Sequence, residues 1–221
     1  MISLKLFLKE FEQRYFYERP SKKYRERLLS DLSPLDKTKL LSDFNVLDKD
    51  GILILPEYFK NIIPNLNQEF QKLLSDFSKS VGRVSENDNN EDIGHYSISN
   101  KGLSDSYYTS QVAIDKYLTK LTSYYWGKQI NIAQAGGTRL EPIDFIDDYR
   151  SMQWHHDRKY KQIKVFVLLT DITKDQQCTY FVPGSHKKWK PKNDNGRRTN
   201  EFIKNYPKPI QAVGKAGTVI V

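Results

Sequence analysis

Residues 154–187 read WHHDRKYKQIKVFVLLTDITKDQQCTYFVPGSHK, and the apolar run 163–169 within them is typical of a buried β-strand. Just before that run stand a histidine and a carboxylate two positions apart, His155 and Asp157. Side chains alternate between the two faces of an extended chain, so these two should project the same way and His156 the opposite way. One imidazole nitrogen and one carboxylate oxygen would then converge on one point, which is half of a metal site.

A histidine and a carboxylate are two of the three protein ligands in the facial triad of non-haem iron(II) oxygenases, which leaves three coordination positions open. The second histidine of such a site has to come from another part of the chain. The ordinary explanation of the pair is a solvated or salt-bridged histidine and aspartate at a strand end. The assignment therefore depends on the sequence around the pair.

Further motifs surround the pair in a fixed order. An upstream DGILILP at 50–56 is predicted as a core strand and precedes the apolar strand 163–169. A further strand predicted at 179–182 leads into PGSHK at 183–187, and AGTVIV at 216–221 follows. Taken together, residues 48–221 resemble the phytanoyl-CoA dioxygenase family of Fe(II)/2-oxoglutarate-dependent oxygenases. In that family a His-x-Asp strand end is followed by an apolar strand and then by a Pro-Gly-Ser-His-Lys turn.

The resemblance implies that His155 and Asp157 hold Fe(II), with 2-oxoglutarate as cosubstrate and O2 as oxidant. The reaction it implies is hydroxylation of a small-molecule or acyl-type substrate, with decarboxylation of 2-oxoglutarate to succinate. Asp157 favours hydroxylation, because related halogenases have a small residue at this position. His186, in the Pro-Gly-Ser-His turn, is expected to be structural and not a ligand.

In the resembled family the third ligand, a histidine, follows a strand like the one predicted at 216–221, and an arginine that binds 2-oxoglutarate lies further on. The 221 residues contain neither after that strand. A chain end inside an apolar strand is unusual, so we expect the sequence to be truncated and the third histidine to lie beyond Val221. The alternative is a protein that naturally lacks these residues, or one that uses other ligands.

Two basic residues on or beside predicted strands, Lys164 and Arg139, are candidates for binding 2-oxoglutarate or an anionic substrate. Either side chain can pair with a carboxylate or phosphate oxygen. Each is also explained as a solvated residue on a strand face. The sequence leaves this choice open.

The chain is helical first and rich in strands later. We expect a helical extension over 1–47, packed on an oxygenase domain over 48–221. Helices are predicted over 20–47, with a break at Ser33 and Pro34, and over 107–126. Together these elements predict a mixed α/β fold with a mainly β core, a double-stranded β-helix (jelly roll, cupin-like) with N-terminal and buttressing helices.

Two other segments between these elements have clear patterns. Leu66, Phe70 and Leu73 recur at helical spacing and predict one apolar stripe. The stretch 80–106 is polar and has no period, so we expect an exposed loop or a lid over the barrel mouth.

Composition limits the class of protein further. With 221 residues and 38% hydrophobic residues, the chain can bury one ordinary core. No apolar run approaches the roughly 20 residues that span a bilayer, and the start of the chain does not resemble a signal peptide. The single cysteine, Cys178, cannot form an internal disulfide, which fits a reducing compartment. We therefore expect a cytoplasmic enzyme with no membrane partner.

The formal charge of +8 supports a rival hypothesis, a non-catalytic basic module that binds nucleic acid or an anionic ligand on a metal-free jelly-roll barrel. Its best candidates are the lysines of 187–192 and the pair Arg197-Arg198. The sequence has no zinc finger, phosphate loop or RNA-binding signature, which argues against nucleic acid. An anionic small-molecule substrate explains the same charges. The identity of the substrate and the oligomeric state are left open by the sequence.

Overall fold

A computed structural model describes residues 20–75, 80–81, 95–98, 106–132, 136–140, 154–156, 162–176, 178–188 and 198–221. The chain divides into two compact units, one of residues up to 48 with 114–132, and one of 49–113 with 133–221. The first unit is helical, and the second contains all the strands of the described residues. The predicted extension over 1–47 and oxygenase domain over 48–221 stay a prediction.

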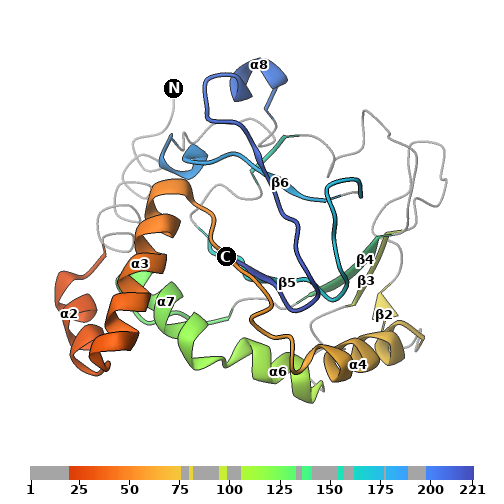
Figure 1. Cartoon of the computed structure of the whole chain (residues 1–221), viewed down its shortest axis with the longest axis horizontal. Helices are drawn as coiled ribbons and strands as arrows, with labels where there is room; N and C mark the ends of the chain where they lie inside the picture. Colours follow the sequence, from red (N-terminus) through yellow and green to blue (C-terminus); the bar gives the residue numbers. More distant parts are fainter. Residues whose placement is uncertain are drawn as a thin grey trace, which may run out of the picture. The chain divides into compact units, whose positions relative to one another are not determined.

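The helical unit contains α2 (Lys22–Ser30), most of α3 (Pro34–Asp50) and α7 (Lys116–Trp126), which Figure 1 shows in red to green. Arg25 joins α2 to α7, because its Nε and Nη2 donate to the carbonyls of Tyr124 and Tyr125 at 2.7 and 2.8 Å. These carbonyls lie in the last turn of α7, where carbonyl oxygens lack partners within the helix and a cationic side chain can donate hydrogen bonds to them. Helix α3 begins at Pro34 after Ser33, as the sequence predicted.

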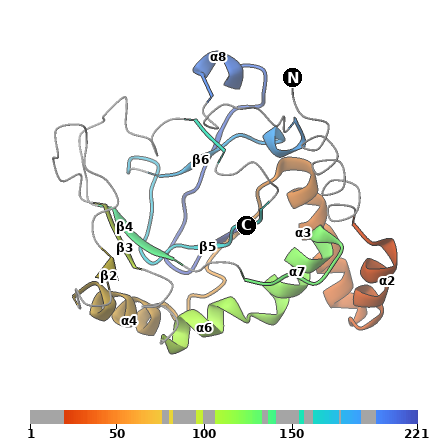
Figure 2. The ribbon, with the colours of Figure 1, turned by 180° about the vertical axis from the view of Figure 1, so that it is seen from behind.

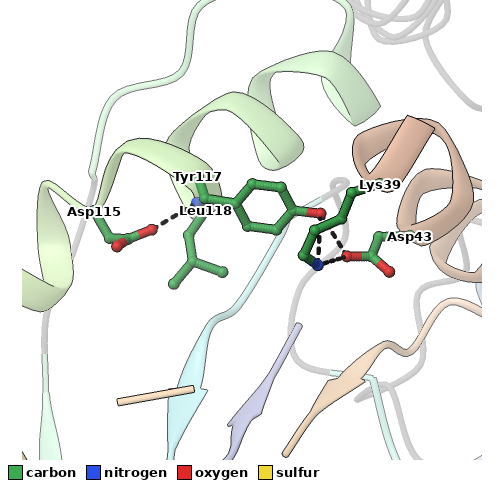
Figure 3. Close-up of polar contacts among 5 residues, drawn as sticks. All are labelled: Lys39, Asp43, Asp115, Tyr117 and Leu118. Atoms are coloured by element: carbon green, nitrogen blue, oxygen red, sulfur yellow. Dashed lines mark hydrogen bonds and ion pairs between the residues drawn. The ribbon is translucent and has the colours of Figure 1, made fainter. Parts of the chain in front are cut away.

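The single helix predicted over 107–126 is wrong, because the structure has two helices there, α6 (Tyr107–Ala113) and α7. The break falls at Asp115, whose carboxylate accepts a hydrogen bond from the Leu118 N–H at 2.8 Å (Figure 3). An aspartate N-cap begins a new helix instead of continuing the old one. In the first turn of α7, the Tyr117 hydroxyl donates to Asp43 Oδ2 of α3, which also accepts from Lys39 Nζ at 2.6 Å.

The main sheet of the second unit has the order β1-β8-β5, with both pairs antiparallel. Its strands are β1 (Ile54–Leu55), β8 (Val219–Ile220) and β5 (Phe166–Val167). The chain end marked C therefore lies beside β5 in both views (Figures 1 and 2). The strands predicted at 50–56, 163–169 and 216–221 are confirmed, although each is shorter than its apolar run.

The core of this unit is built on β8. Val219 is 0% and Ile220 2% exposed, because β8 is paired on both edges and covered on its faces. Ile220 packs with Ile52 and Ala212 in a buried cluster. The partly buried side chains packed against this cluster are those of Ile54, Leu168, Phe181 and Ile210. Burial of these side chains supplies most of the free energy that holds the sheet together.

A second sheet has the order β2-β3-β4, formed by β2 (Ser80–Val81), β3 (His95–Ile98) and β4 (Gly137–Leu140). Helix α4 (Ile63–Ser75) contacts β2 and β3 and runs beside this sheet (Figure 2). Its predicted apolar stripe is confirmed at Leu66 and Phe70, each 6% exposed. The loop predicted over 80–106 is wrong for β2 and β3, because β3 pairs with both β2 and β4 and a polar stretch thereby forms strands.

A smaller pair of strands, β6 (Tyr180–Phe181) and β7 (Ile210–Gln211), is antiparallel and is followed by a bridge between Ile172 and Gly214. The strand predicted at 179–182 is thereby confirmed. The described part of the chain is thus a mixed α/β structure with small sheets. Within the same part, no helix has the length and apolar character that crossing a bilayer requires.

Asp171 fastens the turn before β8. Its Oδ2 accepts from Lys215 Nζ at 2.6 Å, and its Oδ1 accepts from the Ala216 N–H at 2.8 Å. The hydrogen bond from Lys215 lowers the pKa of Asp171 below its ordinary 3.8, and Asp171 in turn raises the pKa of Lys215 above 10.5. A lowered carboxyl pKa stabilises the fold above its unfolded-state value, and this contribution disappears as pH falls through the folded-state value.

We expect Asp171→Asn to lower the melting temperature slightly at neutral pH, and the difference from wild type to shrink as pH falls below about 4 and through the lowered pKa of the folded protein, where Asp171 becomes protonated. It should also shrink as pH rises above about 10.5 and through the raised pKa of Lys215, because Lys215 then loses its proton. Thermal unfolding followed by circular dichroism at pH 3, 7 and 11 measures this. Asp175→Asn, at an exposed carboxylate nearby, is the control. An Asp171→Asn difference that is equal at every pH would contradict the prediction.

Candidate metal centre

The segment 154–156 carries the predicted histidine ligand. His155 is exposed, whereas its neighbours Trp154 and His156 are half-buried. The Arg198 N–H donates to the Trp154 carbonyl at 2.7 Å, and Arg198 Nη2 lies 2.9 Å from His156 Nε2. Trp154 and His156 are therefore both held by the same segment, and alternation along an extended chain would place the His155 side chain on the other face.

Asp157, the predicted carboxylate ligand, lies outside the described residues. Among the residues with described positions, no three His, Cys, Asp or Glu side chains converge as a metal site would require. The assignment of His155 and Asp157 as ligands therefore stays a prediction. Of these two residues, the structure describes the position of His155.

Two other histidines have contacts that suit a structural role. A guanidinium only donates, so His156 accepts from Arg198 through Nε2, and that nitrogen is not open to a metal. His186 packs so closely against Gly51 that a Cβ added to this glycine would come within 2.3 Å of the His186 Nδ1. The Gly184 N–H also donates to the Asp50 carbonyl at 2.8 Å. The Pro-Gly-Ser-His turn is thus joined to the start of the first core strand, two motifs that are far apart in the sequence.

The predicted cosubstrate residues lie on different elements. Lys164 is exposed just before β5, and its Nζ lies 6.0 Å from the centroid of the Phe166 ring. Arg139 lies on β4 opposite Tyr96, and its side chain is outside the described part. Their roles in binding 2-oxoglutarate stay predictions.

Both residues of β6 take part in aromatic pairs, one of them with Trp154 of the segment. The Trp154 and Tyr180 rings meet edge to face with centroids 6.3 Å apart, and Phe166 meets Phe181 at 6.2 Å. The Tyr180 hydroxyl accepts from Gln211 Nε2 at 2.7 Å, which fixes that ring from β7. Pairs of this kind add rigidity beyond the apolar area that they bury.

Sequence reasoning missed Arg198 and Asn200. Arg198 was considered only as part of a basic patch, yet it contacts His156, and Asn200 Oδ1 accepts from Trp154 Nε1 at 2.8 Å. The only local signal was Thr199, a residue that often caps a helix. That threonine predicts the start of α8 (Asn200–Ile203). It does not predict that the residues around it contact the segment 154–156.

The fold matches solved structures of one class. The epimerase SnoN, solved with Fe3+, α-ketoglutarate and nogalamycin RO, is 18% identical with a TM-score of 0.64, over 83% of this chain and 73% of that chain. The non-haem α-ketoglutarate-dependent carbocyclase SnoK from nogalamycin biosynthesis is 13% identical with a TM-score of 0.60, over 87% and 74%. At these identities the likeness defines the fold, which is that of the non-haem α-ketoglutarate-dependent enzymes.

The sequence places the chain within that class. The model of the phytanoyl-CoA dioxygenase (PhyH) family matches residues 47–221, more than half of the chain. The protein belongs to the phytanoyl-CoA dioxygenase family, as its motifs predicted. No curated protein matches the sequence significantly.

Proposed function

We propose that the protein is an Fe(II)- and 2-oxoglutarate-dependent dioxygenase that hydroxylates a small-molecule or acyl-type substrate. Family membership over residues 47–221 supports the class of reaction. The observation that carries the proposal is the position of His155, which is exposed between two residues whose side chains are both held by residues 198–200. The proposed architecture is a double-stranded β-helix with this segment at its mouth.

The donor set fits the metal. A neutral imidazole and a carboxylate are ligands that non-haem Fe(II) accepts, and their spacing at 155 and 157 places both on one face of an extended chain. Because His156 Nε2 accepts from Arg198, His155 is the better candidate ligand of the two adjacent histidines. A bound iron with 2-oxoglutarate would supply the oxidising power for hydroxylation and release succinate and CO2.

The remaining tasks belong to side chains of the protein. His155 and Asp157 are the proposed ligands, and the contacts that hold Trp154 and His156 on either side of His155 favour precise placement of its ring. Lys164 and Arg139 are the proposed partners for the carboxylates of 2-oxoglutarate or for an anionic substrate, since both present permanent positive charge. The Trp154 and Tyr180 rings meet edge to face and help to hold the segment that carries His155.

Anaerobic titration of the full-length protein with Fe(II) in the presence of 2-oxoglutarate tests the proposal. We expect a weak visible charge-transfer band that saturates at one equivalent of metal. On admission of O2, we expect succinate to form at a rate that depends on Fe(II). A protein that gives neither the band nor succinate, while its circular dichroism shows it folded, would overturn the proposal. Retention on a non-specific oligonucleotide that falls steeply with salt would favour the binding module.

A further inference from the structure

Three hydrogen bonds join the segment 154–156 to residues 198–200, which we call the anchoring segment. The Arg198 N–H donates to the Trp154 carbonyl at 2.7 Å, and Arg198 Nη2 donates to His156 Nε2 at 2.9 Å. The Trp154 indole N–H donates to Asn200 Oδ1 at 2.8 Å. One backbone atom and two side chains of the ligand strand are thus fixed by one short stretch of chain.

The contacts hold both neighbours of His155, and alternation along an extended chain then sets the face of His155 itself. All three reach Trp154 or His156, the residues on either side of it. Rotation of the strand about its axis would exchange the two faces, and it would have to break the contacts of both neighbours together. The anchoring segment therefore opposes the orientation in which His156 replaces His155 on the proposed metal face.

The anchoring segment is itself held. The Thr199 hydroxyl accepts from the Phe202 N–H at 3.2 Å and caps α8. The Arg198 guanidinium lies over the Phe202 ring, 5.4 Å from its centroid, and Phe202 contacts Tyr206 at 5.3 Å between centroids. Arg198 thus has a ring on one side and His156 as its acceptor. An arginine confined in this way loses little further entropy on forming the bond.

We propose that Arg198 and Asn200 are positioning residues of the metal centre, which hold the 154–156 strand so that the His155 imidazole faces the iron. The inference rests on the proposed function, because it assumes that His155 is a ligand. Groups that orient ligands without touching the metal commonly change metal affinity by about 10- to 100-fold when they are removed. Here they act on the two residues beside the ligand and not on the ligand itself.

The first test measures metal affinity in single variants. We expect Arg198→Ala and Asn200→Ala each to weaken Co(II) or Fe(II) binding by about 10-fold under anaerobic titration. Lys204→Ala removes a positive charge from the exposed end of the same region, where Lys204 pairs with Glu201 at 2.7 Å, and should bind like wild type. Equal affinities of Arg198→Ala and Lys204→Ala would overturn the inference.

A second test separates positioning from general loss of stability. If Arg198 acts through His156, combining the two substitutions adds nothing. The double variant Arg198→Ala, His156→Ala should then have the same metal affinity as the single variant with the lower affinity. His156→Gln keeps an acceptor for the guanidinium and should recover part of the affinity lost in His156→Ala. Fully additive losses, or no recovery in His156→Gln, would contradict action through this bond.

A third test needs no metal. In the metal-free protein, hydrogen exchange of the peptide that contains 154–156 should be faster in Arg198→Ala and Asn200→Ala than in Lys204→Ala. Unchanged exchange would overturn the anchoring role even if affinity falls. If wild type binds no metal while exchange still responds, the proposed function fails, and with it the role toward iron. The two failures are therefore distinguishable.

Discussion

His155→Ala is expected to weaken Fe(II) binding by more than about 100-fold, beyond the range usual for groups that only orient a ligand. Succinate formation should fall to background for the same reason. The physical basis is direct, because an alanine offers no lone pair to the metal. Anaerobic titration followed by the charge-transfer band measures the affinity, and circular dichroism confirms that the variant is folded.

His156→Ala is the matched control, since it removes the same ring from the adjacent position. Its Nε2 accepts from Arg198, so the loss should act only through the anchoring segment and weaken binding by about 10-fold. The decisive result is which of the two variants binds Fe(II) more weakly. A larger loss in His156→Ala than in His155→Ala would reverse the assignment of faces.

Gly217→Ala is expected to reduce the free energy of unfolding by about 3 kcal/mol or more, a large share of the stability of an ordinary domain. Gly217 has φ +88°, where L side chains are strained, and a Cβ added there would lie 2.6 Å from the Lys60 backbone nitrogen. That neighbour is backbone and cannot rotate away. Relief would have to displace the Gly217 N–H, which donates to the Leu168 carbonyl at 2.8 Å.

Two other glycines separate the cost of the steric clash from the cost of the positive φ. Gly184 has φ +73°, but the nearest atom to a Cβ added there is the Lys49 carbonyl oxygen at 4.0 Å, so Gly184→Ala should show only the conformational part, about 1 kcal/mol. An added Cβ at Gly136 meets no atom within 4 Å, and this position should tolerate alanine within about 0.5 kcal/mol. Urea unfolding of the three variants measures the differences. Equal stability of Gly217→Ala and Gly136→Ala would contradict the steric argument.

The strands of the main sheet were predictable because they are continuous apolar runs bounded by turn residues. The sequence did not predict that β8 lies between β1 and β5, since pairing order depends on segments far apart in the chain. For β2 and β3 the local sequence is polar, and their pairing with each other and of β3 with β4 defines them as strands. The break before α7 had a local signal, Asp115, which the regular spacing of apolar residues on either side concealed.

The candidate site was predictable only in part. His155 and His156 could be assigned to opposite faces from alternation alone, and the contact of His156 with Arg198 agrees with that assignment. The anchoring role of Arg198 could not be predicted, because an arginine in a basic stretch is usually solvated and its acceptor lies in another segment. The packing of His186 on Gly51 agrees with a structural turn histidine.

The position of β8 between β1 and β5 also constrains how the protein is made. Among the described residues β1 pairs only with β8, so this pairing forms only after almost the whole chain between residues 54 and 220 has been synthesised. Contacts of such long sequence separation form slowly. Until then β1 and β5 present open edges to other chains, which is the situation in which newly made proteins aggregate and depend on chaperones.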